Sequence, residues 1–397
     1  MNVEEETPKY DRKKRKKSNI AYIIIFVCFV ALLLTLVLSF GDLTKMAGAF
    51  TEMVSGENVI YLVVAIILAI VFFILYPIPL MLVGRRSGLK SGRMDLWLTG
   101  NCEHFYNGVT PSSSGGQPFQ AYALYQSGDT GASATGVILM NYINIVLCSN
   151  IFGFVSLIFY PKYVQGLANI EGLEMDLSSL QWIAVLGIIL NAANLVLFCV
   201  LGFSKTARRA IMWAFKLVLK PKFLNKRFGK FIPAFDRYLE NAQSTAKVVL
   251  SHWKTFILAV ITRMLVLTIL YSIPFFLMMA MPSLDIHPSD YWLCMLGNSF
   301  ATVCVAWVPT PGAVGAGEIV GAVVLGSITV KSGTSLDFQV AQALSLLNRG
   351  ISFYFVLILS FVTSLIFEIR VSKRIKAKAL EEESAPKENE ENKEDDK

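Results

Sequence analysis

Long apolar runs separated by short polar stretches dominate the chain. A helix rises about 1.5 Å per residue, so about 20 apolar residues are needed to cross a hydrocarbon core of about 30 Å. Six runs meet that length. The pattern therefore predicts six full membrane spans, at about Ile20–Phe40, Val59–Val83, Thr135–Tyr160, Trp182–Phe203, Phe256–Met281 and Phe338–Phe367.

Two stretches between these spans hold polar residues, glycines and prolines that lipid would not tolerate. In Gly100–Tyr125 a Thr-Pro pair precedes three serines and two glycines, and Val308–Glu318 reads VPTPGAVGAGE. Irregular backbone is found at membrane depth only where protein or water surrounds it. The helical arms on either side of each turn are short for a full crossing, so we predict two re-entrant helical hairpins, at residues 94–126 and 291–328. The alternative is that a hairpin crosses fully, which adds two crossings and leaves the orientation of every other span unchanged, so charge counting does not separate the two.

The order of these elements is the same in the two halves of the chain: span, span, hairpin, span. Three full spans are an odd number, so the two halves have opposite orientations. The predicted tips, Val109–Pro111 and Pro309–Pro311, then approach the bilayer midplane from opposite sides. Inverted repeats with broken helices at the midplane are typical of membrane translocators. The predicted fold is an all-α polytopic membrane protein with six full spans and two re-entrant helical hairpins in an inverted repeat.

Basic residues gather at alternate ends of the predicted spans. The run Arg12–Lys17 precedes the first span, eleven Lys and Arg lie within Lys205–Lys247, and a further group follows the last span. Cytoplasmic loops are rich in Lys and Arg, so both termini are predicted to be cytoplasmic. The predicted organisation is a basic N-terminus (1–19), a first repeat (20–160), a second repeat (161–370) with a cytoplasmic basic loop (204–253), and a charged disordered tail (371–397).

Composition supports a membrane protein and excludes several functions. The chain is 54% hydrophobic and 16% charged, whereas soluble domains have about 25% charged residues. It contains no Walker A, GxSxG or HExxH motif and no metal-ligand spacing, so we expect no ATP-driven transport, catalytic residues, metal or cofactor. The basic residues of the 204–253 loop alternate with aromatic residues. This pattern favours helices on an anionic lipid leaflet and gives no indication of a nucleic-acid partner.

The first irregular stretch is a candidate anion site. Gly115, Gly116 and Gln117 precede Pro118, which suits the first position of a helix. Free backbone N–H groups at a helix N-terminus bind anions, and a phospholipid phosphate is the natural occupant. The alternative is a tight turn that needs glycine for close packing.

The second irregular stretch places a carboxylate at the start of a helix. Glu318 either stabilises its own helix N-terminus or meets a proton or a cationic headgroup. Arg263 and Arg349, inside two spans, are either structural partners of Glu318 or Glu103 or ligands of a lipid phosphate. The candidate substrate-binding residues are Glu103, Thr110, Ser112, Ser113, Ser114, Gly115, Gly116, Gln117, Gln120, Arg263, Thr310, Gly312, Gly315, Glu318 and Arg349.

Together, the motifs TPSSSGGQPFQAYALYQSG (110–128) and PTPGAVGAGEIV (309–320) resemble those of the lysylphosphatidylglycerol synthase transmembrane-region family. The resemblance covers about residues 20–370. This family includes the flippase part of bacterial phosphatidylglycerol lysyltransferases, the multiple peptide resistance factors, and many stand-alone relatives. The resemblance implies a flippase in the bacterial plasma membrane that moves a polar-headed phospholipid, anionic or lysylated, and so gives resistance to cationic peptides. The lysyl-transfer domain of the full-length enzymes is missing from this sequence, so we expect no lysyltransferase activity from it.

Two other functions fit the same sequence. One is secondary transport of a small solute or of a polyprenyl-linked lipid. The other is a membrane subunit that anchors a separate lysyltransferase, which would then be a protein partner. A lipid translocator needs a lateral opening to the bilayer, whereas a solute carrier needs a closed, water-filled site.

Overall fold

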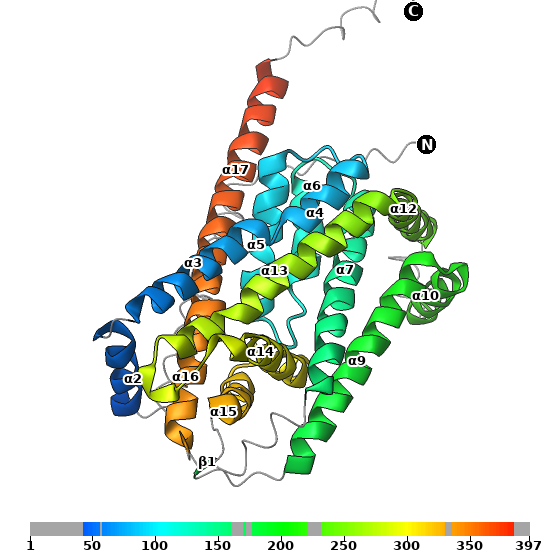
Figure 1. Ribbon diagram of the computed structural model, residues 1–397. Helices are drawn as coiled ribbons and strands as arrows, with labels where there is room; N and C mark the ends of the chain where they lie inside the picture. Colours follow the sequence, from blue (N-terminus) through cyan, green and yellow to red (C-terminus); the bar gives the residue numbers. More distant parts are fainter. Residues whose placement is uncertain are drawn as a thin grey trace, which may run out of the picture.

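The computed structural model is almost entirely helical (Figure 1). The predicted span Ile20–Phe40, the basic N-terminus and the last residues of the tail lie outside the described part of the chain. The structure describes residues 43–55, 58–159, 170–171, 177–220, 232–329 and 336–384.

Five helical segments in the described part are long and apolar enough to cross a membrane. They coincide with five of the six predicted spans, so the chain is a multi-pass membrane protein. Their elements are α3 (Val59–Leu75) with α4 (Ile78–Arg86), α7 (Gly131–Ile158), α9 (Leu177–Phe203), α13 (Trp253–Met279), and α16 (Phe338–Arg349) with the π-helical η4 (Gly350–Phe355) and α17 (Val356–Ser384).

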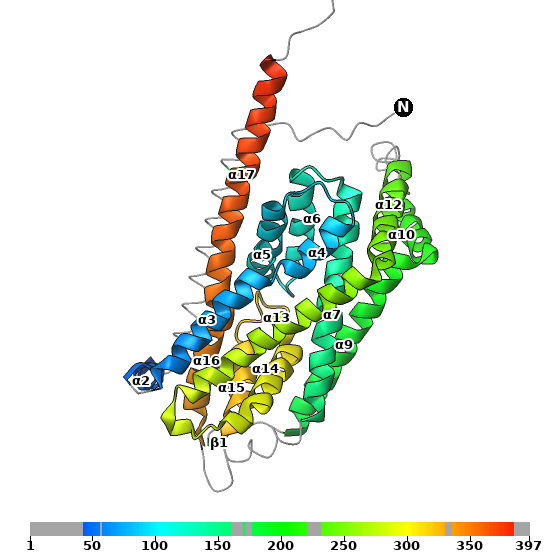
Figure 2. The same cartoon turned by 45° about the horizontal axis from the view of Figure 1, so that its top comes forward.

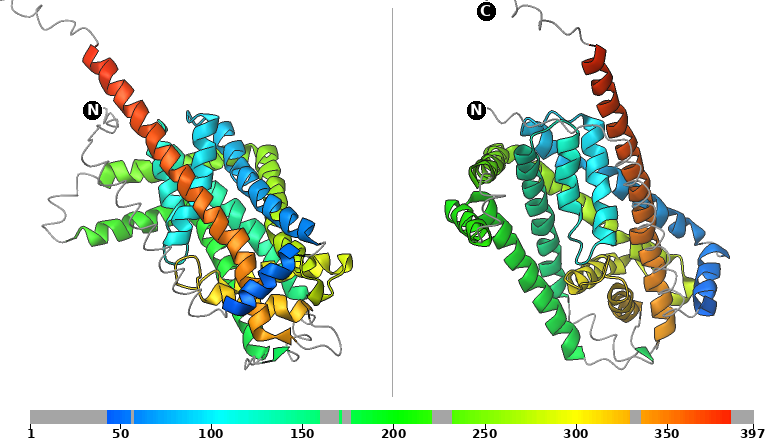
Figure 3. Two further views of the ribbon diagram at one scale, coloured as in Figure 1. Left: turned by 90° about the vertical axis from the view of Figure 1, so that its left-hand side faces the viewer. Right: turned by 180° about the vertical axis from the view of Figure 1, so that it is seen from behind.

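Two pairs of shorter helices lie where the hairpins are predicted. The first pair is α5 (Arg93–Val109) and α6 (Gly116–Gln126); the second is α14 (Tyr291–Val305) and α15 (Ala316–Thr329). The four helices have 17, 11, 15 and 14 residues. At about 1.5 Å per residue, each is shorter than a bilayer core of about 30 Å. In Figure 3 the loop between α5 and α6 points toward the second pair.

The two tips touch each other and share one backbone conformation. Pro111 and Pro311 form an antiparallel bridge, so the predicted meeting of the tips is confirmed. In each tip the two residues after the Thr-Pro pair have positive φ, with values of 50° and 50° in the first tip and 59° and 52° in the second. Left-handed backbone costs a non-glycine residue roughly 1–2 kcal/mol. Ser112, Ser113 and Ala313 therefore hold strained conformations that the packing of the two tips maintains.

The main core surrounds the second helix pair. Buried side chains of α13, α14, α15 and α16 pack together there, among them Leu277, Phe300, Val324 and Leu344. The spans expose large apolar residues on their outer faces, for example Ile60 of α3 and Trp182 of α9. Exposed apolar faces of this extent suit helices that contact lipid.

The loops contain structure that the pattern did not predict. α2 (Leu43–Ser55) follows the first predicted span and buries Ala49 and Met53. Most described residues of the basic loop form α10 (Lys205–Val218) and α12 (Ile232–Ser251), which lie at the end of α9 opposite β1 (Figure 2). The remaining elements are β1 (Ile170–Glu171), its parallel partner β2 (Leu336–Asp337), η2 (Pro282–Leu284) and η3 (Pro288–Asp290).

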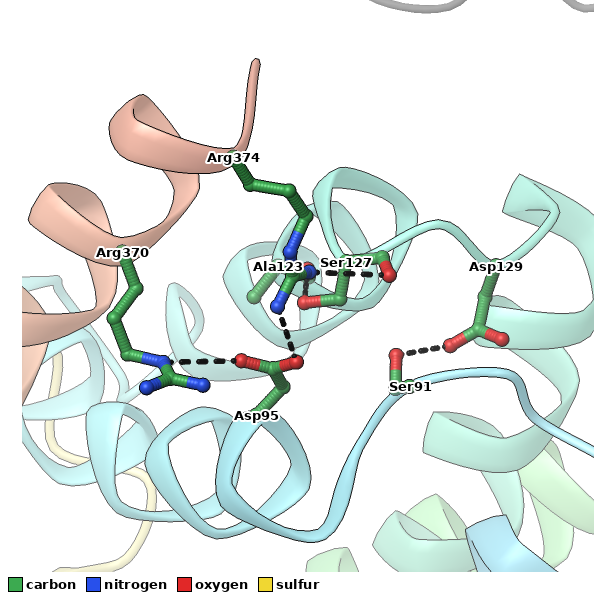
Figure 4. A network of polar contacts seen from close by, with 7 residues as sticks. All are labelled: Ser91, Asp95, Ala123, Ser127, Asp129, Arg370 and Arg374. Carbon is green, nitrogen blue, oxygen red and sulfur yellow. Dashed lines mark hydrogen bonds and ion pairs between the residues drawn. The ribbon is translucent and has the colours of Figure 1, made fainter. Parts of the chain in front are cut away.

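The prediction of a disordered tail from residue 371 is wrong for its first part, because α17 continues as a helix to Ser384. An ion-pair network ties this helix to the start of α5 (Figure 4). The buried carboxylate of Asp95 lies 2.6 Å from Nη2 of Arg374 and 3.4 Å from Nε of Arg370. Arg374 also donates a hydrogen bond to the carbonyl of Ser127, just after α6. One end of the first helix pair is therefore fixed to α17.

Candidate functional site

A cavity of about 920 Å³ lies beside the first tip. Binding pockets for small ligands typically measure roughly 300–1,000 Å³. Its walls come from α7, α9, α10 and α12 and are mostly apolar, whereas the α5–α6 pair contributes a group of polar residues. These are Glu103, Asn107, Ser112, Ser113, Ser114 and Gln117. Trp307, just after α14, also lines the cavity, and its indole donates to Asn191 of α9. One cavity thus offers an apolar surface and a concentrated polar end.

Glu103 is the centre of the polar end. Its side chain is buried and accepts four hydrogen bonds: from Gln117 and Asn107 on Oε1, and from Gln120 and Tyr76 on Oε2. An ionised carboxylate is acceptor-only, and donors on both oxygens are what a buried one requires. The donors come from α5, α6 and the α3–α4 junction. Glu103 therefore joins both arms of the first pair to the neighbouring span.

Arg263 of α13 lies behind Glu103, with Tyr76 between them. Its guanidinium is 4.3 Å from the Tyr76 ring centroid, and its Nη2 donates to Asn141 of α7 at 3.3 Å. The side chain is only 1% exposed, and Nε and Nη1 have no hydrogen-bond partner among the described residues. Burial of a charge without a nearby opposite charge is very costly. We therefore interpret Arg263 as the positive charge that balances Glu103 across the tyrosine.

The expectation of free backbone N–H groups at the first tip is wrong in this conformation. The N–H of Gly115 donates to Oγ1 of Thr110 at 2.9 Å, and that of Gly116 donates to Oδ1 of Asn107 at 2.8 Å. A Cβ at Gly116 would lie 2.5 Å from that same amide oxygen. These contacts favour the alternative of a tight, closely packed turn. The hydroxyl group of Ser114 donates to the carbonyl of Pro111, so the hydroxyl groups of Ser112 and Ser113 are the serine donors on the cavity wall.

The second tip holds a buried ion pair. Oε1 of Glu318 lies 2.8 Å from Nε of Arg349, and Oε2 accepts from the N–H of Gly315. Tyr354 donates to the same carboxylate, and Nη2 of Arg349 donates to the carbonyl of Gly312. Arg349 is thus the structural partner of Glu318. Glu318 also stabilises its own helix start, as one of the sequence alternatives proposed. Arg349 lies directly before η4, and π-helical turns are frequent at functional sites.

The structure separates the candidate residues into two groups. Glu103, Ser112, Ser113, Ser114 and Gln117 line the cavity. The others lie behind its wall or at the second tip: Thr110, Gly115, Gly116, Gln120, Arg263, Thr310, Gly312, Gly315, Glu318 and Arg349.

Sequence reasoning missed several residues of the cavity wall, including Asn191, Asn194, Arg208 and Trp307. A signal existed for the two asparagines, because polar residues one helical turn apart in an apolar span indicate an internal face. No such signal distinguishes Arg208 among the eleven basic residues of its loop.

Comparison with known proteins gives one family match. The family model described as "Lysylphosphatidylglycerol synthase TM region" matches residues 20–360. No curated protein and no solved structure matches the chain. The family match includes both helix pairs, both tips and all the cavity-lining residues described above. The chain therefore belongs to the lysylphosphatidylglycerol synthase transmembrane-region family.

Proposed function

We propose that this protein is a flippase that moves a polar-headed phospholipid, such as lysyl-phosphatidylglycerol, between the two leaflets of the bacterial plasma membrane. The cavity beside the first tip is the main observation behind the proposal. It combines apolar walls with one polar end centred on Glu103. A lipid headgroup has the complementary chemistry, with a charged end followed by apolar acyl chains.

In this mechanism α5–α6 and α14–α15 are re-entrant hairpins of an inverted repeat, with both termini cytoplasmic. The shared backbone of the tips and their contact at Pro111 and Pro311 support that arrangement. The headgroup enters the cavity while the acyl chains stay in the bilayer. An ammonium group approaches the negative charge of Glu103, and the hydroxyl groups of Ser112 and Ser113 donate to uncharged oxygens of the headgroup.

Purified protein in liposomes tests the proposal. The lipid is lysyl-phosphatidylglycerol with a fluorescent headgroup-proximal label, and dithionite added outside bleaches only the label in the outer leaflet. We expect a protein-dependent loss of the protected fraction. Glu103→Gln removes the charge at the polar end and should slow this loss at least about tenfold, the effect of about 1.4 kcal/mol on a barrier.

Glu52→Gln is the matched control, because its carboxylate lies on α2, away from the cavity, and accepts from Ser283. It should flip like the unchanged protein. Equal bleaching with and without protein would contradict the proposal. Solute uptake without lipid movement would favour a secondary transporter. Co-purification of a lysyltransferase with a non-flipping protein would favour a membrane subunit.

A further inference from the structure

α10 carries an arginine on its inward face, where its pattern calls for an apolar residue. Met212 of this helix is buried, and the ring of Phe215 lies 4.6 Å from that of Phe235 on α12. Arg208 is one turn before Met212 and therefore lies on the same face. The next residue, Arg209, lies on the exposed face with Trp213. A charged residue placed inward needs a partner or a function.

Arg208 lines the cavity and has partners that solvent reaches easily. Its side chain is 22% exposed and forms ion pairs with two carboxylates of α12, at 2.9 Å to Glu240 and 3.7 Å to Asp236. The side chains of Glu240 and Asp236 are 63% and 46% exposed. Exposed ion pairs contribute at most about 1 kcal/mol to stability, so water can replace Arg208 as the partner of these carboxylates at a small cost in free energy. A phosphodiester matches the guanidinium fork with two parallel hydrogen bonds.

Arg208 also differs in charge from the rest of the cavity wall. Among the described lining residues, Arg208 is the positively charged one and Glu103 the negatively charged one. They come from different parts of the wall: Glu103 from the α5–α6 pair, and Arg208 from the helices at the end of α9 (Figure 2). The outer face of α10 has Arg209 and Lys216 beside exposed Trp213. A helix of this kind lies on an anionic lipid surface, where phosphodiester groups are concentrated.

We propose that Arg208 binds the phosphodiester of the lipid headgroup at the α10–α12 end of the cavity. When the lipid binds, the carboxylates of Glu240 and Asp236 leave Arg208 and become hydrated. Phosphate oxygens then accept the hydrogen bonds of the guanidinium. This inference rests on the proposed function, since it names the residue that receives the lipid phosphate. It also assigns the two charges of the cavity to different parts of one headgroup, with phosphate at Arg208 and ammonium at Glu103.

Lipid binding tests the assignment without any flipping. The dissociation constant for dioleoylphosphatidylglycerol is measured on the full chain by native mass spectrometry from detergent micelles. Arg208→Gln should weaken binding about five- to tenfold, because it removes a charge-assisted contact. Arg209→Gln has the same charge change on the outer face and should stay within about twofold. Glu240→Gln should tighten binding severalfold, because it frees Arg208 from its stronger partner.

The variant Glu240→Gln separates a phosphate site from a merely structural ion pair. A structural pair predicts that Glu240→Gln and Arg208→Gln have the same effect, and that result would overturn the proposal. Equal weakening by Arg208→Gln and Arg209→Gln would overturn it as well. Inorganic phosphate and glycerophosphoglycerol are the competitors, and displacement of the lipid by inorganic phosphate at equal concentration would assign the site to free phosphate instead. Arg208-dependent binding without flipping would count against the proposed function alone.

Discussion

The ion pair at the second tip gives the most quantitative prediction. Arg349 and Glu318 are 14% and 11% exposed, so both charges are largely removed from water. Removing one partner of a buried pair leaves the other charge unpaired and typically costs 3–5 kcal/mol. Glu318 would keep two donors after Arg349→Met, from Gly315 and Tyr354. We therefore expect the lower end of that range, about 3 kcal/mol of unfolding free energy, and about 2–3 kcal/mol for Glu318→Gln.

The double variant should cost much less than the sum of the two single variants. With both charges gone, no unpaired charge remains, and the remaining cost is that of packing and of the hydrogen bond to Gly312. We expect a coupling free energy of about 2 kcal/mol, within the range measured for contacting residues. Equilibrium unfolding in mixed micelles, followed by tryptophan fluorescence as the fraction of denaturing detergent rises, gives all four free energies.

The control is Arg209→Met, which removes an exposed arginine of α10 and should change stability by less than about 0.5 kcal/mol. If the two single changes simply add in the double variant, within about 0.5 kcal/mol, Arg349 and Glu318 do not interact and the description of the second tip is refuted.

Two further predictions concern packing and the fixed end of α5. Gly317→Ala would place a Cβ 2.0 Å from Nη1 of Arg349 and should cost about 2 kcal/mol in the same unfolding assay, whereas Gly48→Ala, with open space around it in α2, should be neutral or stabilising. A milder cost for Gly317→Ala than for Gly48→Ala would be inconsistent with the ion-pair geometry. Asp95→Asn removes the negatively charged partner that Arg370 and Arg374 share. Amide hydrogen exchange in residues 370–377 should become severalfold faster, whereas exchange in α9 should not change. Unchanged exchange in residues 370–377 would show that the network does not hold α17.

The helices were predictable because their determinants are local. Apolar run length alone locates the five spans in the described residues, and the shortness of the arms around the Thr-Pro turns identified the helix pairs. The meeting of the tips followed from the order of elements in the two halves. The bridge between Pro111 and Pro311 bears this out.

The contacts of the site were less predictable because they depend on tertiary geometry. The sequence left open which of Glu318 and Glu103 is the partner of Arg349, since both Arg263 and Arg349 lie inside predicted spans. The N–H groups of Gly115 and Gly116 are satisfied by Thr110 and Asn107, and only the loop conformation reveals this. The inward position of Arg208 likewise depends on how α10 packs against α12. Local pattern shows that a helix is amphipathic but not what its inner face contacts.

The path of the lipid through the cavity is the central claim, and blocking that path tests it most directly. Ser114 lines the cavity and is exposed, so Ser114→Cys can be modified with a bulky thiol reagent in the purified protein. Dithionite bleaching of labelled lysyl-phosphatidylglycerol is then compared in liposomes before and after modification, with the unchanged protein treated alike to control for its own cysteines. We predict that Ser114→Cys flips lipid until it is modified and that the modification then stops flipping. Undiminished flipping by the fully modified variant would contradict a route through this cavity.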